Sequence, residues 1–335
     1  MTSSLDRAVA GLLASAPGPD VRARDAVAER ARNVLRPTGA LARLDEVAAW
    51  LASWQRTEEP RVERPGVAVF AADHGVAARG VSAYPPAVTE AMLGALREGV
   101  ATAAAMARAV GAELRVVDAG VGRPTGDITR EPALTPERFD ESFAAGRAAV
   151  ETLACDLLVL GEMGIANTTP AAAVAAALFG GPAEQWTGRG TGIDEETWCH
   201  KVAVVDAART QVPAAAGPIE NLRRCGGAEL VAIAGAVVEA RVRSIPIVLD
   251  GFVVTSAAAA LEVLWPGALD HCIAGHRSPE PGHTLLLEKL AKEPLLDLEL
   301  RLGEGSGALA AVPLVRLAAA AVVDVATFEE WGLER

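Results

Sequence analysis

The side chain best placed to do chemistry in this chain lies in the glycine-rich stretch Arg301–Gly307. One carboxylate, Glu304, stands there between Gly303 and Gly305, and glycine backbone can adopt conformations closed to other residues and approach a ligand closely. Ser306 is a favoured helix N-cap, and the free N–H groups of a helix start suit an anion. The combination indicates a base held beside a phosphorylated substrate, although a glycine-rich turn with a solvated glutamate would look the same.

A second glycine-rich loop, Gly188–Asp194, precedes a helical run that contains Lys201. Backbone N–H groups around Gly190 and Gly192 can cradle a phosphate, and a lysine can supply the countercharge. The loop is not a Walker A motif, and the dinucleotide fingerprint G-x-G-x-x-G after a first strand is absent, which argues against a dehydrogenase. A surface turn with an exposed lysine is the alternative.

Asp250 follows the hydrophobic run 246–249 and is itself followed by Gly251. Phosphoribosyltransferases that use phosphoribosyl pyrophosphate carry two adjacent acids at such a point, for the ribose hydroxyls and magnesium. A lone carboxylate can accept hydrogen bonds from a ribose diol but is poorly equipped to hold a metal–pyrophosphate group. If a ribose phosphate is the substrate, we therefore expect a leaving group other than pyrophosphate.

Three further side chains are candidates for contact with a ligand. Glu162, within Gly-Glu-Met-Gly, can bond a ribose or a cationic ring, or simply cap the next turn. Tyr84, the single tyrosine, can wall a flat aromatic pocket together with Met92, although such residues are more often ordinary core. The chain has no G-x-S-x-G motif and no catalytic Cys/His arrangement, so covalent catalysis is not expected.

Short β-rich runs alternate with alanine-rich helical runs through the middle of the chain, a pattern typical of βαβ units and a parallel sheet. Polar or acidic residues beside glycine follow every predicted strand. Because ligands of open α/β sheets bind outside the carboxyl ends of the strands, we expect these ends to share one site. The predicted strands cover residues 66–72, 113–118, 156–160, 245–249 and 270–274.

The two ends of the chain are predicted to be helical. Helices are expected over Val21–Leu35 and Leu41–Trp54, separated by a Pro-Gly break, and a long apolar helix is expected over 308–326.

Composition narrows the class of protein. The chain has 335 residues, of which 51% are hydrophobic and 4% aromatic, so the core must consist mainly of Ala, Val and Leu. A net charge of −12 argues against a nucleic-acid partner, because phosphate contacts need clustered Lys and Arg. Four widely spaced cysteines and five histidines predict neither a disulfide framework nor a metal site. No uncharged segment is apolar enough to span a membrane, and a cytoplasmic protein is expected.

Several long motifs, taken in order, resemble one known family. The resemblance runs from about Arg36 to near the C-terminus and is most specific around Glu162 and Glu304. The family is that of the nicotinate-nucleotide:dimethylbenzimidazole phosphoribosyltransferases, which belong to the lower-ligand branch of cobalamin biosynthesis. The matching motifs cover residues 71–76, 81–85, 161–171, 188–194 with Lys201, 249–252 and 301–308.

The resemblance implies a reaction, a fold and a set of residues. Ribose 5-phosphate would pass from nicotinate mononucleotide to 5,6-dimethylbenzimidazole by a single inverting displacement, giving α-ribazole 5′-phosphate and nicotinate. The enzyme would need no metal or cofactor and would form a homodimer. The implied fold is α/β, a three-layer parallel-sheet Rossmann-like large domain over 61–305 with a small helical domain from 1–60 and 306–335. Glu304 would be the catalytic base, and the substrate-binding positions would be Tyr84, Met92, Glu162, Gly164, Gly190, Gly192, Lys201, Asp250, Ser278, Gly303 and Gly305.

Tyr84 and Met92 depart from the pattern, because some members carry Ser and Gln at these points. The departure bears on the identity of the acceptor base more than on the chemistry. Adenine, a phenol or another benzimidazole are alternative acceptors. A non-catalytic nucleotide-binding subunit is an alternative of another class, which would have no need of Glu304.

Overall fold

The structure, a computed structural model, describes residues 3–334 and is built on one parallel sheet of six strands. The strand order is β2-β1-β3-β4-β5-β6, and every neighbouring pair is parallel. The strands are β1 (Pro65–Ala72), β2 (Glu113–Gly120), β3 (Leu157–Met163), β4 (Ile247–Leu249), β5 (Cys272–His276) and β6 (Pro294–Leu296). The predicted α/β class with a parallel sheet is confirmed, and each predicted strand is present within a few residues of its expected bounds.

One strand, β6, escaped the sequence analysis. It has only three residues, begins with a proline and lies at the edge of the sheet beside β5. A proline cannot donate to the hydrogen-bond ladder, so it is tolerated at such an edge, and a run this short carries no recognisable alternation.

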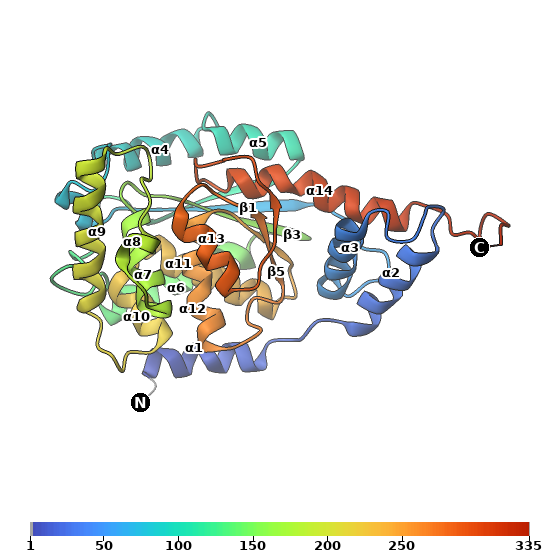
Figure 1. The fold of residues 1–335 in the computed structure, drawn as a ribbon, viewed down its shortest axis with the longest axis horizontal. Helices are drawn as coiled ribbons and strands as arrows, with labels where there is room; N and C mark the ends of the chain where they lie inside the picture. The colour runs from blue at the N-terminus through green and yellow to red at the C-terminus, as the bar shows by residue number, and fades with distance from the viewer. Residues whose placement is uncertain (1–2, 335) are drawn as a thin grey trace.

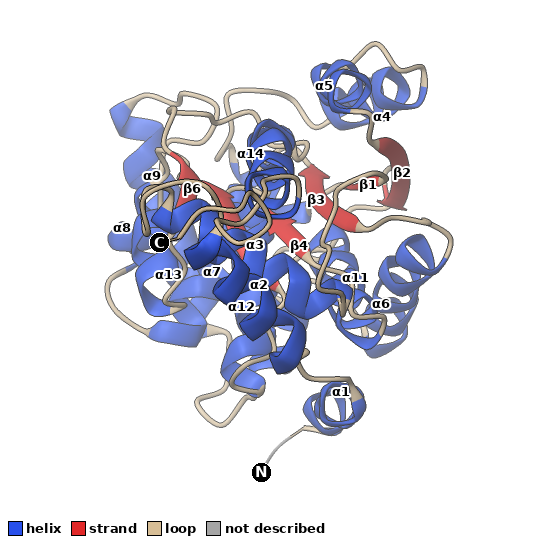
Figure 2. Ribbon diagram, turned by 90° about the vertical axis from the view of Figure 1, so that its right-hand side faces the viewer, coloured by secondary structure: helices blue, strands red, loops and turns tan. Residues whose placement is uncertain are grey.

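Helices cover both faces of the sheet (Figures 1 and 2). The helices are α1 (Ser4–Ser15), α2 (Val21–Asn33), α3 (Ala42–Gln55), the 3-10 helix η1 (Gly75–Arg79), α4 (Ala87–Arg97), α5 (Thr102–Val110), α6 (Pro136–Glu151), α7 (Thr168–Phe179), α8 (Ala183–Trp186), α9 (Glu195–Thr210), α10 (Pro218–Cys225), α11 (Ala228–Val242), α12 (Phe252–Leu264), α13 (Pro281–Lys289) and α14 (Ser306–Val323).

Residues that alternate along a strand point to opposite faces of the sheet, and the two faces bury different cores. Phe70 and Leu160 pack with α6, α7, α11 and α12, whereas Val69 and Val159 pack with α5, α14 and the α2–α3 pair.

The two chain ends meet at one side of the molecule. Helices α2 and α3 pack on each other and on α14, and the bridge between Val34 and Thr327 joins the ends (Figure 1). Helix α1 lies apart from this group and packs on α10 and α11. The division into a catalytic domain and a small helical domain stays a prediction.

Helix α14 is long and apolar enough, by length and composition alone, to cross a bilayer. In this fold it is a core helix, because Leu309, Val312 and Val315 are fully buried in the core that also contains Val69 and Val159. Its charged residue, Arg316, donates to the backbone oxygens of Val62 and Val110.

Candidate active site

A cavity of about 390 Å³ opens at the carboxyl ends of β3, β4 and β5. The predicted site residues line it, except for Gly192 and Gly305. Gly192 is exposed and closes the turn of its loop by donating to Arg189 O, whereas Gly305 is buried and donates its N–H to Asp250. The lining residues that were predicted are Tyr84, Met92, Glu162, Gly164, Gly190, Lys201, Asp250, Ser278, Gly303 and Glu304.

The ends of β1 and β2 do not line this cavity, so the expectation that all five predicted strand ends share the site is wrong for two of them. Strand β2 is an edge strand, and Asp118 there accepts backbone N–H groups of its own turn. After β1, Asp73 accepts the N–H of Gly122, and His74 pairs with the buried Glu229 at 2.6 Å. These acids shape turns, which is the ordinary role of Asp beside Gly.

Glu304 is held in the cavity with its backbone in the left-handed region, at φ 60°. Its N–H donates to Glu162 O at 3.0 Å, and its carboxylate oxygen Oε2 accepts the N–H of Ala103 at 3.3 Å. Burial raises the pKa of Glu304, the Ala103 N–H opposes this, and the nearby charge of Asp250 adds to it. No Lys or Arg pairs with Glu304 among residues 3–334, so its carboxylate is free to take a proton from a ligand.

The support beneath Glu304 is Asp250. Its two carboxylate oxygens accept the N–H groups of Gly305, at 3.2 Å, and Ala308, at 2.9 Å. His276 Nε2 lies 3.3 Å from Asp250 Oδ1. The Asp250 carboxylate, just after β4, therefore caps the N-terminus of α14 and fixes the turn that carries Glu304.

This arrangement corrects two expectations about the start of α14. Gly305, not Ser306, is the N-cap residue, and no side chain of the helix itself caps it. Because Asp250 already binds the N–H groups of Gly305 and Ala308, these groups hold the turn that carries Glu304 and are not open to a substrate phosphate. The helix also ends at Val323, three residues before the predicted end.

Glu162 lies at the end of β3 on the floor of the cavity, where its carboxylate bonds Asn167. Burial raises the pKa of Glu162 to about 8, with the charges of Asp250 and Glu304 acting in the same direction. The Gly303 backbone passes so close that an added Cβ would lie 2.5 Å from Glu162 Oε1. A glycine is needed there for space as well as for its φ of 82°.

At the opposite end of the cavity, Lys201 is buried at the Gly188–Asp194 loop. Its Nζ donates to Thr168 Oγ1 at 2.8 Å and to Gly188 O at 3.0 Å. Burial lowers the pKa of Lys201 to about 8, while the charge of Glu280 favours the protonated form. An ammonium with a remaining proton to donate, beside glycine N–H groups, is a suitable phosphate subsite.

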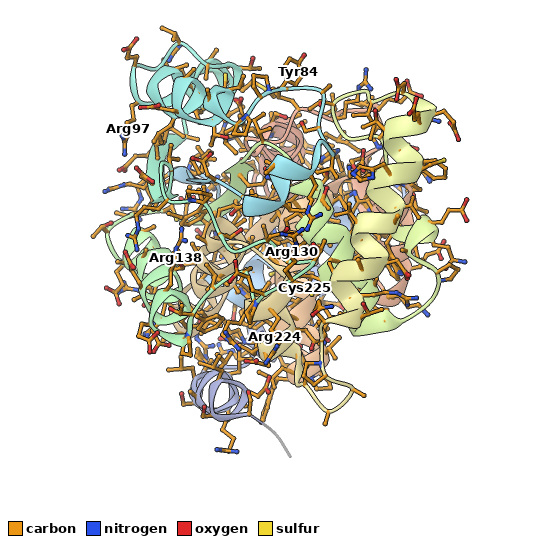
Figure 3. All side chains as sticks on the ribbon, turned by 90° about the vertical axis from the view of Figure 1, so that its left-hand side faces the viewer. Tyr84, Arg97, Arg130, Arg138, Arg224 and Cys225 are labelled. Carbon is orange, nitrogen blue, oxygen red and sulfur yellow. The ribbon has the colours of Figure 1, made fainter. Side chains whose placement is uncertain are left out.

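Between these two ends, the wall of the cavity is apolar. Met92 and Val88 come from α4, and Met163 follows Glu162. Tyr84 lies on the loop before α4, half-exposed at the molecular surface (Figure 3). A slot of Met and aromatic side chains suits a flat ring.

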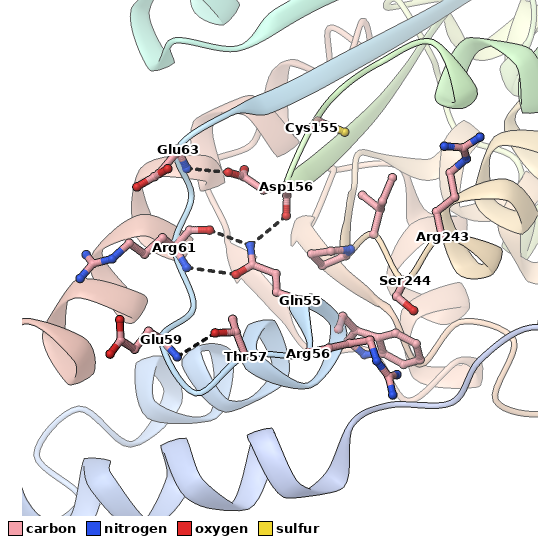
Figure 4. A pocket seen from close by; sticks show the side chains of 13 residues that line it. Gln55, Arg56, Thr57, Glu59, Arg61, Glu63, Cys155, Asp156, Arg243 and Ser244 are labelled. Carbon is pink, nitrogen blue, oxygen red and sulfur yellow. Dashed lines mark hydrogen bonds between the residues drawn. The ribbon is translucent and has the colours of Figure 1, made fainter.

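Another cavity, of about 460 Å³, lies at the amino ends of β3 and β4 (Figure 4). Several of its polar groups bind one another: Gln55 Nε2 donates to the backbone oxygens of Arg61 and Asp156, and Asp156 accepts the N–H of Glu63. Ligands of parallel sheets bind at the other edge, so this cavity is not the candidate active site.

Proteins of known family are similar to this chain along most of its length. A family model described as "Phosphoribosyltransferase" matches residues 16–333. The chain is 48% identical, over 318 residues, to the nicotinate-nucleotide–dimethylbenzimidazole phosphoribosyltransferase of Cereibacter sphaeroides, covering 95% of this chain and 94% of the relative. A relative of the same name from Methylocella silvestris is 48% identical over 320 residues, with the same coverage of both chains. This chain belongs to that phosphoribosyltransferase family.

A solved structure is similar to this chain in fold as well as in sequence. The crystal structure of CobT from Thermus thermophilus matches with a TM-score of 0.90 and 42% identity, covering 94% of this chain and 99% of that chain. The α/β fold inferred from the resemblance is thereby confirmed for this phosphoribosyltransferase.

Some residues that line the phosphoribosyltransferase cavity were not singled out from the sequence. His276 follows a predicted strand, but its contact with Asp250 joins residues 26 positions apart, and no spacing pattern in the sequence indicates that contact. Asn167 binds Glu162 within the motif 161–171, whereas the partner of Thr168, Lys201, is 33 positions away and is brought near only by folding. Glu280 lies outside the motifs that resemble the family.

Proposed function

We propose that this enzyme moves ribose 5-phosphate from nicotinate mononucleotide to 5,6-dimethylbenzimidazole, releasing nicotinate, with Glu304 as the general base. The observation that carries the proposal is the position of Glu304: a buried carboxylate with a raised pKa and no paired cation among residues 3–334, in a cavity with a phosphate subsite at one end and an apolar slot beside it. The names of the relatives support the choice of substrates.

The departure of nicotinate needs little assistance from the protein. The ring nitrogen of nicotinate is already cationic in its mononucleotide, so the C–N bond breaks without metal activation. The incoming benzimidazole is neutral and must lose its N–H proton to become a good nucleophile. A positioned base such as Glu304 contributes about 10²–10⁴-fold to such a step. Attack on the face opposite nicotinate converts a β-riboside into an α-riboside.

The other cavity residues hold the reactants in line for this displacement. In the proposal, Lys201 and Gly190 bind the 5′-phosphate, and the ribose lies near Glu162 and Ser278. The Ser278 hydroxyl is buried and has no hydrogen-bond partner among the described residues, so it is available to a ribose hydroxyl. Holding both rings in an attack geometry lowers the barrier by removing the entropy cost of bringing them together.

Glu162 adds an electrostatic contribution to the same step. With a pKa of about 8 it is largely neutral at pH 7 in the protein alone. A bound pyridinium, or an oxocarbenium-like ribose, favours its ionised form by charge attraction. Asp250 lines the cavity, so its predicted contact with the ribose stays a prediction, and its oxygens also support the Glu304 turn.

The proposal is tested by incubating the purified protein with nicotinate mononucleotide and dimethylbenzimidazole and following nicotinate and α-ribazole 5′-phosphate by chromatography. Omission of the base is the control for simple hydrolysis. Binding of the nucleotide without turnover for any base would contradict the proposal and favour a nucleotide-binding subunit. The homodimer and the cytoplasmic location stay predictions, the first open to a mass measurement in solution.

A second acceptor remains a candidate because of two residues in the slot. Tyr84 and Met92 line the cavity, and their side chains are more apolar than the Ser and Gln of some family members. Competition between dimethylbenzimidazole, adenine and a phenol at limiting enzyme decides which base is preferred.

We expect binding of the nucleotide to weaken above pH 8, because Lys201 loses its charge there. Its pKa, lowered to about 8 by burial, leaves the ammonium form dominant below pH 8 and the neutral amine above it. The phosphate itself stays a dianion throughout, since its second pKa is about 6. The KM for nicotinate mononucleotide should rise up to about tenfold per pH unit above 8, with kcat less affected.

The matched control for this profile is Lys201→Met, which has no charge to lose. Its KM should be high at pH 7 and should lack the wild-type rise above pH 8. Glu162, with a pKa of about 8, ionises in the same range and is unchanged in the variant, so any change left in the variant's KM measures the contribution of Glu162. A wild-type KM that is flat from pH 7 to 9.5 would rule out Lys201 as the phosphate-binding cation.

A further inference from the structure

Glu280 places a carboxylate inside the phosphate subsite. It is the N-cap residue of α13 and lines the cavity. Its Oε1 accepts the N–H of Gly190 at 2.8 Å, and its charge favours the protonated form of Lys201. The two groups proposed to bind the substrate phosphate therefore already face an anion that belongs to the protein.

The carboxylate fits the loop closely but is incompletely satisfied. A Cβ added at Gly188 would lie 2.0 Å from Glu280 Oε2, so the carboxyl group lies directly against the loop backbone. Glu280 Oε2 is buried and has no hydrogen-bond partner among the described residues. A buried carboxylate oxygen without a partner is costly. The position thus favours an anion but does not satisfy this one fully.

We propose that Glu280 is the resident anion of the phosphate subsite and that the 5′-phosphate of the substrate displaces it. The inference rests on the proposed function, which supplies the phosphate. A phosphate dianion and the Glu280 carboxylate would lie close together if both were bound at the Gly190 N–H and the Lys201 ammonium. Because like charges repel each other, the two anions do not occupy these donors at the same time. The protein keeps Lys201 charged and the loop ordered before the nucleotide arrives, and Glu280 returns when the product leaves.

The displaced side chain has a place to go. Glu280 also lines an adjoining cavity of about 600 Å³, together with Arg189 and Arg301, and both arginines lie at the boundary because they line the active-site cavity as well. Arg301 is exposed and has no ion-pair partner among residues 3–334, whereas Arg189 is paired with Glu195. Rotation of the Glu280 side chain toward Arg301 exchanges one cation for another and vacates the N–H of Gly190.

The test measures binding of ribose 5-phosphate by calorimetry to the wild type and to Glu280→Gln. Glutamine keeps a carbonyl oxygen that can accept the Gly190 N–H but has no charge to compete with phosphate. The dissociation constant for ribose 5-phosphate should fall about tenfold, while that for free dimethylbenzimidazole should not change. Glu184→Gln is the matched control, because Glu184 lines the adjoining cavity but not the phosphate subsite, and it should leave both constants unchanged.

The variant Arg301→Gln gives a second, independent test of the exchange. In the wild-type background it should weaken ribose 5-phosphate binding several-fold, since the displaced carboxylate loses its new partner, and in the Glu280→Gln background it should have no effect. Equal weakening in both backgrounds would overturn the exchange, because Arg301 would then act on the phosphate directly.

Two further outcomes separate this inference from the proposed function. Unchanged or weaker binding by Glu280→Gln, with binding reduced in Lys201→Met, overturns the role of Glu280 alone. Unchanged binding in Glu280→Gln and in Lys201→Met overturns the phosphate subsite itself and with it that part of the proposed function.

Discussion

Replacing Glu304 with glutamine is expected to lower kcat about 10²–10⁴-fold while nucleotide binding stays near its wild-type level. Glutamine has nearly the shape of glutamate, and its side-chain oxygen can still accept the Ala103 N–H. The turn held by Asp250 is untouched. Only the ability to take a proton from the incoming base is lost, and steady-state kinetics with nicotinate mononucleotide and dimethylbenzimidazole measure it.

Glu299→Gln is the matched control for this variant. Glu299 lies on the same C-terminal stretch, is exposed, and also has a positive φ, of 56°, so the same chemical change is made on similar backbone outside the cavity. Its kcat should equal that of the wild type. Near-normal turnover by Glu304→Gln would remove Glu304 from the role of base.

Replacing Gly161 with alanine is expected to be nearly as damaging, although this residue carries no functional group. A Cβ at Gly161 would lie 2.4 Å from both the carbonyl carbon of Glu304 and the nitrogen of Gly305. Strand β3 is fixed by its neighbours in the sheet, so the Glu304 turn must move. A displacement of about 1 Å can cost about 100-fold in kcat, and overpacking of this kind costs about 1–3 kcal/mol of stability.

Thermal unfolding and kinetics measured together separate the two effects of Gly161→Ala. Gly94→Ala is the control, since a Cβ there meets nothing within 4 Å and the residue lies inside α4. That change should leave kcat intact and stabilise the protein by about 0.5–1 kcal/mol. Full activity in Gly161→Ala would show that the Glu304 turn does not depend on contact with β3.

Much of the architecture follows from local patterns in the sequence. Buried parallel strands such as β1 and β3 appear as short Val- and Leu-rich runs between alanine-rich helices, and they were located because their burial on both faces leaves an unbroken apolar signal. The three-residue β6 carries no such signal. Glu304 and the loop before Lys201 are recognisable in the sequence because a charged side chain lies close to glycines in both segments.

The roles that the sequence analysis missed depend on pairs far apart in the chain. Asp250 was expected to bind ribose, and only the fold brings Gly305 and Ala308, 55 and 58 positions away, onto its oxygens. Glu280 and Gly190 are 90 positions apart, and nothing in either neighbourhood indicates their contact.

The sequence alone thus determined the class of fold, the family and the residue types that do chemistry, because each of these is carried by contiguous motifs and by periodic burial. The tertiary structure alone decided which carboxylates surround Glu304, the proposed base, and which of them support its turn. Glu304, Asp250, Glu162 and Glu280 are chemically alike, and they differ in burial, in N–H partners and in neighbouring charge. Those properties are set by strand order and helix packing, which no local pattern encodes.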